Sequence, residues 1–212
     1  MCAVPGFCFK TTWLAVRGRT VREVADALDL RERETLDWAT GTDRAYAQGV
    51  YVAEPVPGWV LAHGRLDLPP GLDTTEPEFR DWLRELSRTL GEVQFFVTER
   101  VPDYHLWARA VDGDLLRAYC FIGERGEVPL VVGDPTVVEI ERNVGIRRRE
   151  PGMEHWSDDE LDRWHEAMPN EFDVMAIAGS WSVDPSRIDD ATVTGDGIFG
   201  RPPTGSKGTW GR

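Results

Sequence analysis

The sequence has few positive charges compared with its negative ones. Its 212 residues include 24 lysine and arginine residues against 37 aspartate and glutamate residues, which gives a formal net charge of −13 at pH 7. A chain with this charge repels the phosphate backbones of DNA and RNA. The composition therefore argues against a nucleic-acid-binding protein and favours a basic partner.

Cysteine is scarce, and long hydrophobic segments are missing. The three cysteines, Cys2, Cys8 and Cys120, do not have the spacing of a zinc site. We expect them to be reduced thiols, with a disulfide between Cys2 and Cys8 as the alternative. The N-terminal residues lack the basic and apolar regions of a signal peptide, and no apolar run is long enough to cross a bilayer. The sequence thus predicts a cytoplasmic protein that does not enter a membrane.

Motifs for common cofactors are absent as well. The sequence contains no G-x-x-x-x-G-K-[ST], G-x-G-x-x-G or G-x-S-x-G pattern, so it predicts neither a bound nucleotide nor a serine hydrolase. His155 and His165 are not at helical spacing, and the acidic residues around them lack the regular oxygen ligands of a calcium loop. We therefore expect no cofactor and no metal ion.

What the sequence does contain is a series of short apolar strands joined by tight turns. Asp112-Gly113 is a strong hairpin signal between two of these strands. A helix over 76–90 is predicted from a single apolar stripe, which consists of Phe79, Trp82, Leu83, Leu86 and Leu90. Adjacent short strands favour an antiparallel sheet. We predict an α+β fold, with a mainly antiparallel sheet packed by helices on one face.

The C-terminal part of the sequence divides into a helical section and a tail. Helices are predicted over 157–168 and 173–181. From residue 188 the chain is rich in glycine, threonine, aspartate and proline, a composition typical of flexible segments. We expect a single domain over 1–187 and a flexible tail over 188–212. The polar residues 31–48 are expected to be mostly loop.

The predicted hairpin suggests a catalytic pair. With a two-residue turn at Asp112-Gly113, His105 would face Cys120 across two strands, with Asp103 nearby. A cysteine beside a histidine is the smallest unit that can supply a thiolate nucleophile. The alternative is that Cys120, within the apolar run 118–122, is buried and inert.

A second candidate site lies at the start of the same strand. Arg100, Tyr104 and Trp107 lie close in sequence to Asp103 and His105, and this mixture of groups is suited to a polar small-molecule ligand. The alternative is that Tyr104 and Trp107 pack on opposite faces of the sheet while Asp103 stabilises the turn.

Acidic residues gather around the first of the two C-terminal helices. The candidate partner-binding residues are Asp158, Asp159, Glu160, Asp162 and Glu166. The first three would lie in the first turn, where the helix dipole favours negative charge. The default interpretation is a solvated acidic face, and the functional interpretation is a docking surface for a basic partner.

Several aromatic and turn segments resemble a known group of proteins. They are WLAVRG at 13–18, the helix at 21–28, GVYVAE at 49–54, GWVL at 58–61, GEVQFF at 91–96 and YHLWA at 104–108. Together they resemble an actinobacterial family of small proteins of unknown function, over roughly the first two-thirds of the chain. The resemblance implies the α+β fold and a bacterial source, and it implies no activity.

Two functions follow from these patterns. The first is an acidic protein-interaction module of the cytoplasm, which binds a basic protein as an immunity-type or accessory factor would. The alternative is a small enzyme or ligand-binding accessory protein of a biosynthetic cluster, with a pocket around Asp103, Tyr104, His105 and Cys120.

Overall fold

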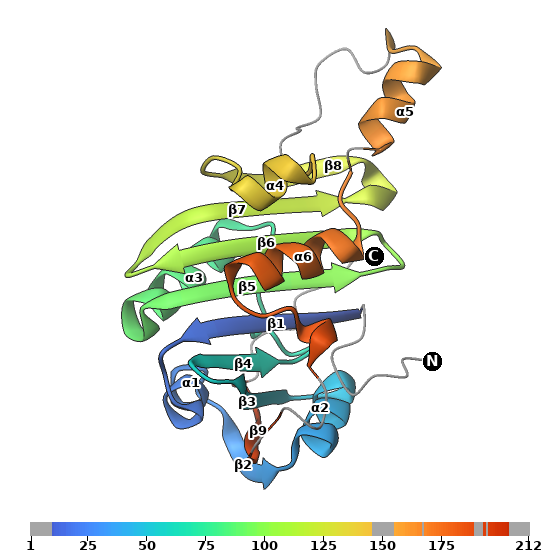
Figure 1. The fold of residues 1–212 in the computed structure, drawn as a ribbon. Coiled ribbons are helices and arrows are strands. Elements are labelled where there is room, and N and C mark those ends of the chain that lie inside the picture. Colours follow the sequence, from blue (N-terminus) through green and yellow to red (C-terminus); the bar gives the residue numbers. More distant parts are fainter. Residues whose placement is uncertain (1–9, 146–154, 167, 189–192, 194, 204–212) are drawn as a thin grey trace.

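The computed structural model describes residues 10–145, 155–166, 168–188, 193 and 195–203. These residues form a nine-stranded antiparallel sheet in the order β2-β9-β3-β4-β1-β5-β6-β7-β8 (Figure 1). The strands are β1 (Lys10–Arg17), β2 (Arg31–Leu36), β3 (Val50–Val56), β4 (Trp59–His63), β5 (Glu92–Glu99), β6 (Tyr104–Val111), β7 (Asp114–Ile122), β8 (Glu127–Val132) and β9 (Gly197–Arg201). The α+β class predicted from the sequence is confirmed.

Helices are distributed along the chain. They are α1 (Val21–Ala27), α2 (Trp38–Ala47), α3 (Pro77–Leu90), α4 (Val137–Glu141), α5 (Asp158–Glu166) and α6 (Glu171–Trp181), with short 3-10 turns η1 (Gly123–Arg125) and η3 (Pro185–Arg187). The strongest sequence prediction, α3, is confirmed, and its apolar stripe is largely buried. The prediction that residues 31–48 are mostly loop is wrong, because they form β2 and α2.

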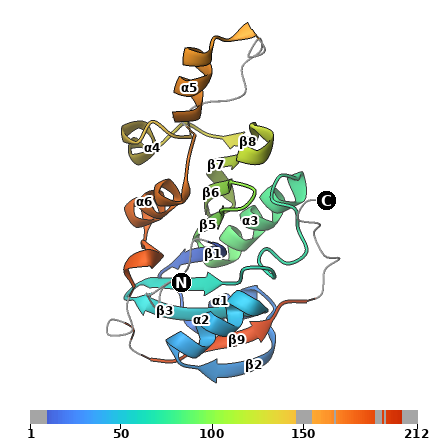
Figure 2. The same cartoon turned by 90° about the vertical axis from the view of Figure 1, so that its right-hand side faces the viewer.

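Helices cover both faces of the sheet, not one as the sequence analysis expected. Leu14 and Val16 of β1 belong to a core that also contains side chains of α1 and α3. Trp13 and Ala15, which alternate with them, belong to a second core with side chains of α2 and α6. Figure 2 shows α3 and α6 on opposite sides of the strands. Because neighbouring residues of β1 are apolar on both faces, each face needs a covering layer.

The predicted C-terminal tail contains a strand inside the sheet. β9 lies between β2 and β3, so the expectation of a flexible tail over 188–212 is wrong for residues 197–201. Phe199 is 1% exposed within the second core. A Cβ atom at Gly197 would lie 2.5 Å from the ring of Tyr51, so glycine permits the close approach. Residues 189–192, 194 and 204–212 lie outside the described part of the chain.

Replacement of Phe199 tests the position of β9. We expect Phe199→Ala to lower the free energy of unfolding by about 3–5 kcal/mol, the usual cost of removing a buried phenylalanine ring. Phe172→Ala is the matched control, since Phe172 is 60% exposed and should change stability by only about 0.5 kcal/mol. Urea unfolding of both variants measures the difference. Equal, small effects would mean that residues 197–201 are not part of the folded sheet.

Candidate functional site

The β6–β7 hairpin separates the two members of the predicted catalytic pair. Val111 pairs with Asp114 as predicted, but the register shifts by one residue after Arg109. His105 therefore pairs with Phe121, while Cys120 pairs with Leu106. Since a shift of one residue moves side chains to the other face, His105 and Cys120 lie on opposite faces of the sheet. The prediction of a cysteine–histidine pair is wrong.

Cys120 is buried among the apolar side chains of the first core. Burial raises the pKa of the Cys120 thiol to about 12. A thiol with this pKa is protonated at neutral pH, whereas the nucleophile in cysteine chemistry is the thiolate. The alternative interpretation, a buried and inert cysteine, agrees with this environment.

His105 is buried on the other face and holds the turn before β6. Its Nε2 atom lies 2.9 Å from Oδ1 of Asp103, and its Nδ1 atom lies 3.3 Å from the Thr98 hydroxyl. The backbone carbonyl of Asp103 also accepts a hydrogen bond from the amide of Gly123 at 2.9 Å. His105 and Thr98 are both fully buried, whereas about half of the Asp103 side chain is exposed. The three side chains stabilise the turn, and the buried imidazole of His105 is not accessible to a substrate.

The other candidates around β6 are also dispersed. Arg100 is mostly exposed and forms an ion pair with Glu171 at 3.0 Å. Tyr104 belongs to the first core and Trp107 to the second, so the two rings pack on opposite faces as the alternative interpretation expected. Of the candidate catalytic and ligand-binding residues, Tyr104 lines the cavity described below, and the others are not part of its lining.

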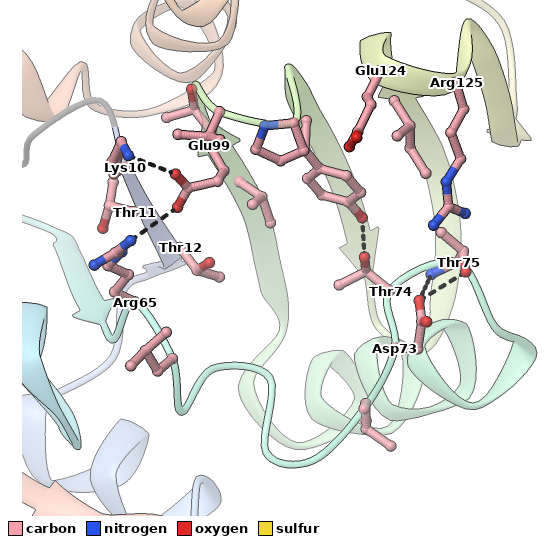
Figure 3. A pocket seen from close by; sticks show the side chains of 18 residues that line it. Lys10, Thr11, Thr12, Arg65, Asp73, Thr74, Thr75, Glu99, Glu124 and Arg125 are labelled. Carbon is pink, nitrogen blue, oxygen red and sulfur yellow. Dashed lines mark hydrogen bonds and ion pairs between the residues drawn. The ribbon is translucent and has the colours of Figure 1, made fainter. Parts of the chain in front are cut away.

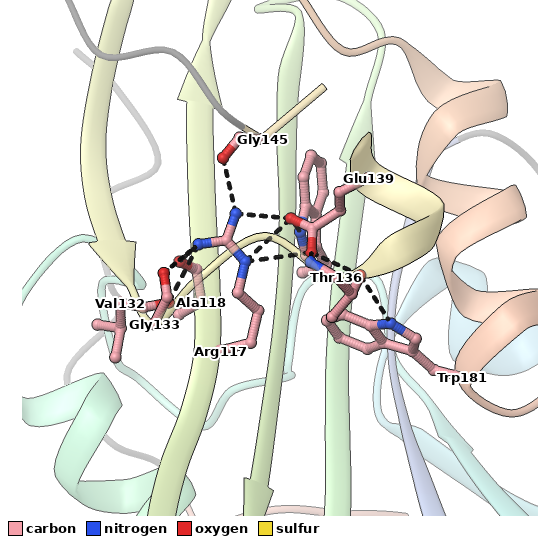
Figure 4. Close-up of polar contacts among 9 residues, drawn as sticks. Arg117, Ala118, Val132, Gly133, Thr136, Glu139, Gly145 and Trp181 are labelled. Carbon is pink, nitrogen blue, oxygen red and sulfur yellow. Dashed lines mark hydrogen bonds and ion pairs between the residues drawn. The ribbon is translucent and has the colours of Figure 1, made fainter. Parts of the chain in front are cut away.

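Trp107 takes part in a buried polar network that sequence analysis missed (Figure 4). Its indole N–H donates to Oε1 of Glu139 at 2.7 Å, and Arg117 donates to the same oxygen from Nη2 at 2.6 Å. Arg117 also donates to the backbone carbonyls of Gly133 and Gly145. The two charges are almost fully buried, so each depends on the other for compensation. This network fixes α4 against the sheet.

An open cavity of about 650 Å³ lies at one end of β1, β5 and β6. Its walls come from the start of β1, the loop before α3, the β5–β6 turn and η1 (Figure 3). The apolar lining residues are Leu66, Leu72, Val97, Val101, Pro102 and Ile122. The charged lining residues are Lys10, Arg65, Asp73, Glu99, Glu124 and Arg125. This combination of apolar surface and a few polar groups is typical of small-molecule sites.

One side of the cavity carries an ion-pair cluster. Glu99 lies 3.3 Å from the Lys10 ammonium and 3.5 Å from Nη2 of Arg65, at two different carboxylate oxygens. The guanidinium of Arg65 also stacks over the ring of Tyr46, 5.0 Å from its centroid. These contacts hold both cations beside one carboxylate.

The loop before α3 forms the opposite side. Oδ1 of Asp73 accepts hydrogen bonds from the backbone N–H of Thr75 at 2.9 Å and from its hydroxyl at 2.7 Å. The N-cap of α3 is Glu76, and Thr75 belongs to the turn before it. The hydroxyls of Thr74 and Tyr104 hydrogen-bond to each other, and burial raises the pKa of the Tyr104 phenol. Tyr104 therefore remains a neutral hydroxyl at the cavity wall.

The acidic helix α5 lies beyond the β8 edge of the sheet (Figure 1). The predicted partner-binding residues Asp158, Asp159, Glu160 and Asp162 are exposed on it, and the side chain of Glu166 lies outside the described part of the structure. Hydrogen bonds from Ser157 to Glu160 lower the pKa of that carboxyl and cap the helix. Trp164 anchors α5 by packing edge-on against Phe121.

Comparison with known proteins gives no relative from which a function could be transferred. No family model, curated protein or solved structure matches this chain. The resemblance to an actinobacterial family therefore stays a prediction. Within the part of the chain that the structure describes, no helix combines the length and the apolar character needed to cross a bilayer.

Thiol labelling tests the environment of Cys120. In a Cys2→Ser/Cys8→Ser background, we expect Cys120 in the folded protein to react at least about one hundred times more slowly than in denaturant, because a buried, protonated thiol reacts only after opening. Reaction with a chromogenic disulfide at neutral pH measures both rates. Rapid labelling of the folded protein, slowed by His105→Ala, would instead support the catalytic pair.

Proposed function

We propose that the protein binds a small molecule in the cavity between β1, the loop before α3 and η1. The observation that carries the proposal is the cavity itself, which has about 650 Å³ of space and is lined by both apolar and charged side chains. This volume lies within the range of about 300–1,000 Å³ that is usual for ligand pockets. The proposal follows the ligand-binding alternative predicted from the sequence, and Tyr104 belongs both to the predicted pocket and to this cavity.

The position of the cavity supports binding more than catalysis. Its walls are loops and strand ends held by a packed sheet, an arrangement that often carries ligand sites. The candidate nucleophile Cys120 and its predicted base His105 are both absent from its lining. The proposal is therefore a ligand-binding accessory protein of the bacterial cytoplasm and includes no reaction.

A bulky substitution within the cavity tests the proposal. We expect Thr75→Trp to weaken the binding of cavity ligands by at least about tenfold, because the indole would occupy space that a ligand needs. Thr89→Trp is the matched control, since Thr89 is exposed on α3 and does not line the cavity. A protein-observed NMR screen of small molecules, followed by titration of the hits, measures both variants.

Hits that shift resonances of Thr74 and Tyr104, and that are lost only in Thr75→Trp, would support a binding function. Hits that map to other surfaces, or that bind Thr75→Trp as well as the unmodified protein, would contradict it.

A second function, the docking of a basic protein, is supported by α5. Its exposed carboxylates Asp158, Asp159 and Asp162 lie on a helix at the edge of the molecule, and the whole chain has a net charge of −13. Opposite charge on a partner would raise the association rate and favour correct partners over incorrect ones. This surface suits an immunity-type or accessory factor.

Neutralising α5 tests the docking function. We expect the triple variant Asp158→Asn/Asp159→Asn/Asp162→Asn to recover at least about tenfold less of a basic partner from lysates of the source organism at low salt. The control variant Glu76→Gln/Glu78→Gln/Asp81→Asn removes three exposed charges near the start of α3. Quantitative mass spectrometry identifies each recovered protein and measures its amount, and the sequence of each protein gives its net charge. Equal losses with both variants would show that only net charge matters and would reject α5 as the docking surface.

A further inference from the structure

If the proposed cavity binds a ligand, the arrangement of its charges specifies the kind of ligand. We propose that the cavity binds a short apolar peptide with free termini, a zwitterion whose two charges are separated by an apolar middle. The carboxylate would lie toward Lys10 and Arg65, and the ammonium toward Asp73 and Glu124. This proposal rests on the proposed function and goes beyond it by naming the ligand class.

The charged residues form two groups at opposite sides of the cavity (Figure 3). On one side, Lys10 and Arg65 share the single carboxylate of Glu99, which leaves an excess of one positive charge. On the other side, Asp73 and Glu124 outnumber Arg125, which leaves an excess of one negative charge. The lining is neutral in total but dipolar, and a zwitterion matches both of its ends.

The positive side has unused donors for a carboxylate. Nη2 of Arg65 pairs with Glu99, whereas its Nη1 makes no hydrogen bond among the described residues, and the side chain is 30% exposed. Stacking on Tyr46 holds the guanidinium plane, so less rotamer freedom would be lost when it binds an anion. A guanidinium presents several N–H donors to a carboxylate, and such charge-assisted bonds are the stronger class.

The negative side has unused acceptors for an ammonium. Within the described part of the chain, the carboxylate of Glu124 makes no side-chain hydrogen bond or ion pair, and Asp73 uses only Oδ1 for Thr75. An ammonium group has three N–H donors and needs several oxygen acceptors when it leaves water. Asp73 and Glu124 both lie on this side of the cavity and offer such oxygens.

Between the two charged sides the wall is apolar with two hydroxyls. Val97, Leu72 and Ile122 supply surface for an aliphatic or aromatic side chain. The Thr74 and Tyr104 hydroxyls, which are bonded to each other, form the polar part of this wall. A ligand with a net negative charge would be repelled by a protein of net charge −13. A zwitterion avoids this repulsion because its own net charge is zero.

Blocked peptides test the proposal. Ala-X-Ala tripeptides, with leucine, valine or phenylalanine at X, are titrated into the ¹⁵N-labelled protein at neutral pH and low salt, together with their N-acetylated and C-amidated forms. We expect at least one free tripeptide to shift the amide resonances of Thr74 and Tyr104. Blocking either terminus should weaken its binding by about tenfold or more, because each removes a charge-assisted contact.

Two charge variants assign each terminus to its side. Arg65→Gln should weaken binding of the free peptide about tenfold. It should leave binding of the C-amidated peptide unchanged, since that peptide has no C-terminal carboxylate to contact Arg65. Glu124→Gln should weaken the free peptide similarly and leave the N-acetyl form unchanged. Arg84→Gln and Glu85→Gln, which remove the same charges from α3 outside the cavity, should leave all affinities unchanged.

The outcomes separate this inference from the binding function. If small molecules from the screen bind the cavity but no tripeptide does, or if blocked and free peptides bind equally, the zwitterion proposal is rejected and the binding function stands. If neither screen hits nor peptides shift the cavity resonances, both are rejected.

Discussion

The structure depends on a sheet that is apolar on both of its faces. An antiparallel sheet often leaves one face in water, but consecutive residues of the central strands are buried here on alternate sides, as for Trp13 and Leu14 or Phe95 and Phe96. Burial of each large side chain contributes roughly 1.5–3 kcal/mol, so neither face can be left uncovered. The order of helices along the chain follows from this need, with α1 and α3 on one face and α2 and α6 on the other.

The same constraint places the cavity. Along β1 and β5, apolar positions give way to polar ones at one end, where Lys10 and Thr12 lie beside Glu99. Polar groups of this kind do not close a dry core, because each needs a hydrogen-bond or charge partner. The loop before α3 passes over this end, and its Thr74 partly satisfies Tyr104. An open, polar space remains where the apolar sheet stops.

Local signals in the sequence predicted the elements they belong to. The stripe of α3 and the Asp112-Gly113 turn are both confirmed, since each depends on residues that are close together in the sequence. The sequence also contains a signal for helices on both faces, which the prediction of one covered face did not use: runs such as residues 13–16 are continuously apolar and do not alternate with polar residues. The position of β9 has no such signal, because its five residues include two glycines and its partners β2 and β3 are far away in sequence.

The candidate site was harder to predict for the same physical reason. One extra residue in β7 reversed the faces of Cys120 and Tyr119. The residues at the bulge, Leu115 and Leu116, are ordinary apolar strand residues and do not indicate it. The cavity combines four segments between residues 10 and 125, so only Tyr104 was found through its own neighbours in sequence. The pairing of distant strands is set by the whole core, so it cannot be inferred from the residues around one motif.

The two proposed functions meet at η1. Glu124 and Arg125 of η1 line the cavity, while Trp164 of α5 reaches the next residue, Gly126, where a Cβ would lie 3.6 Å from the indole ring. Gly126 adopts a positive φ of 59°, a backbone conformation that favours glycine, so a residue with a side chain would be strained at this turn. A basic partner whose binding to α5 altered the Trp164–Gly126 contact would therefore act next to Glu124 and Arg125. Thermodynamic linkage then requires any such effect to be mutual, with ligand binding changing the partner's affinity by the same factor.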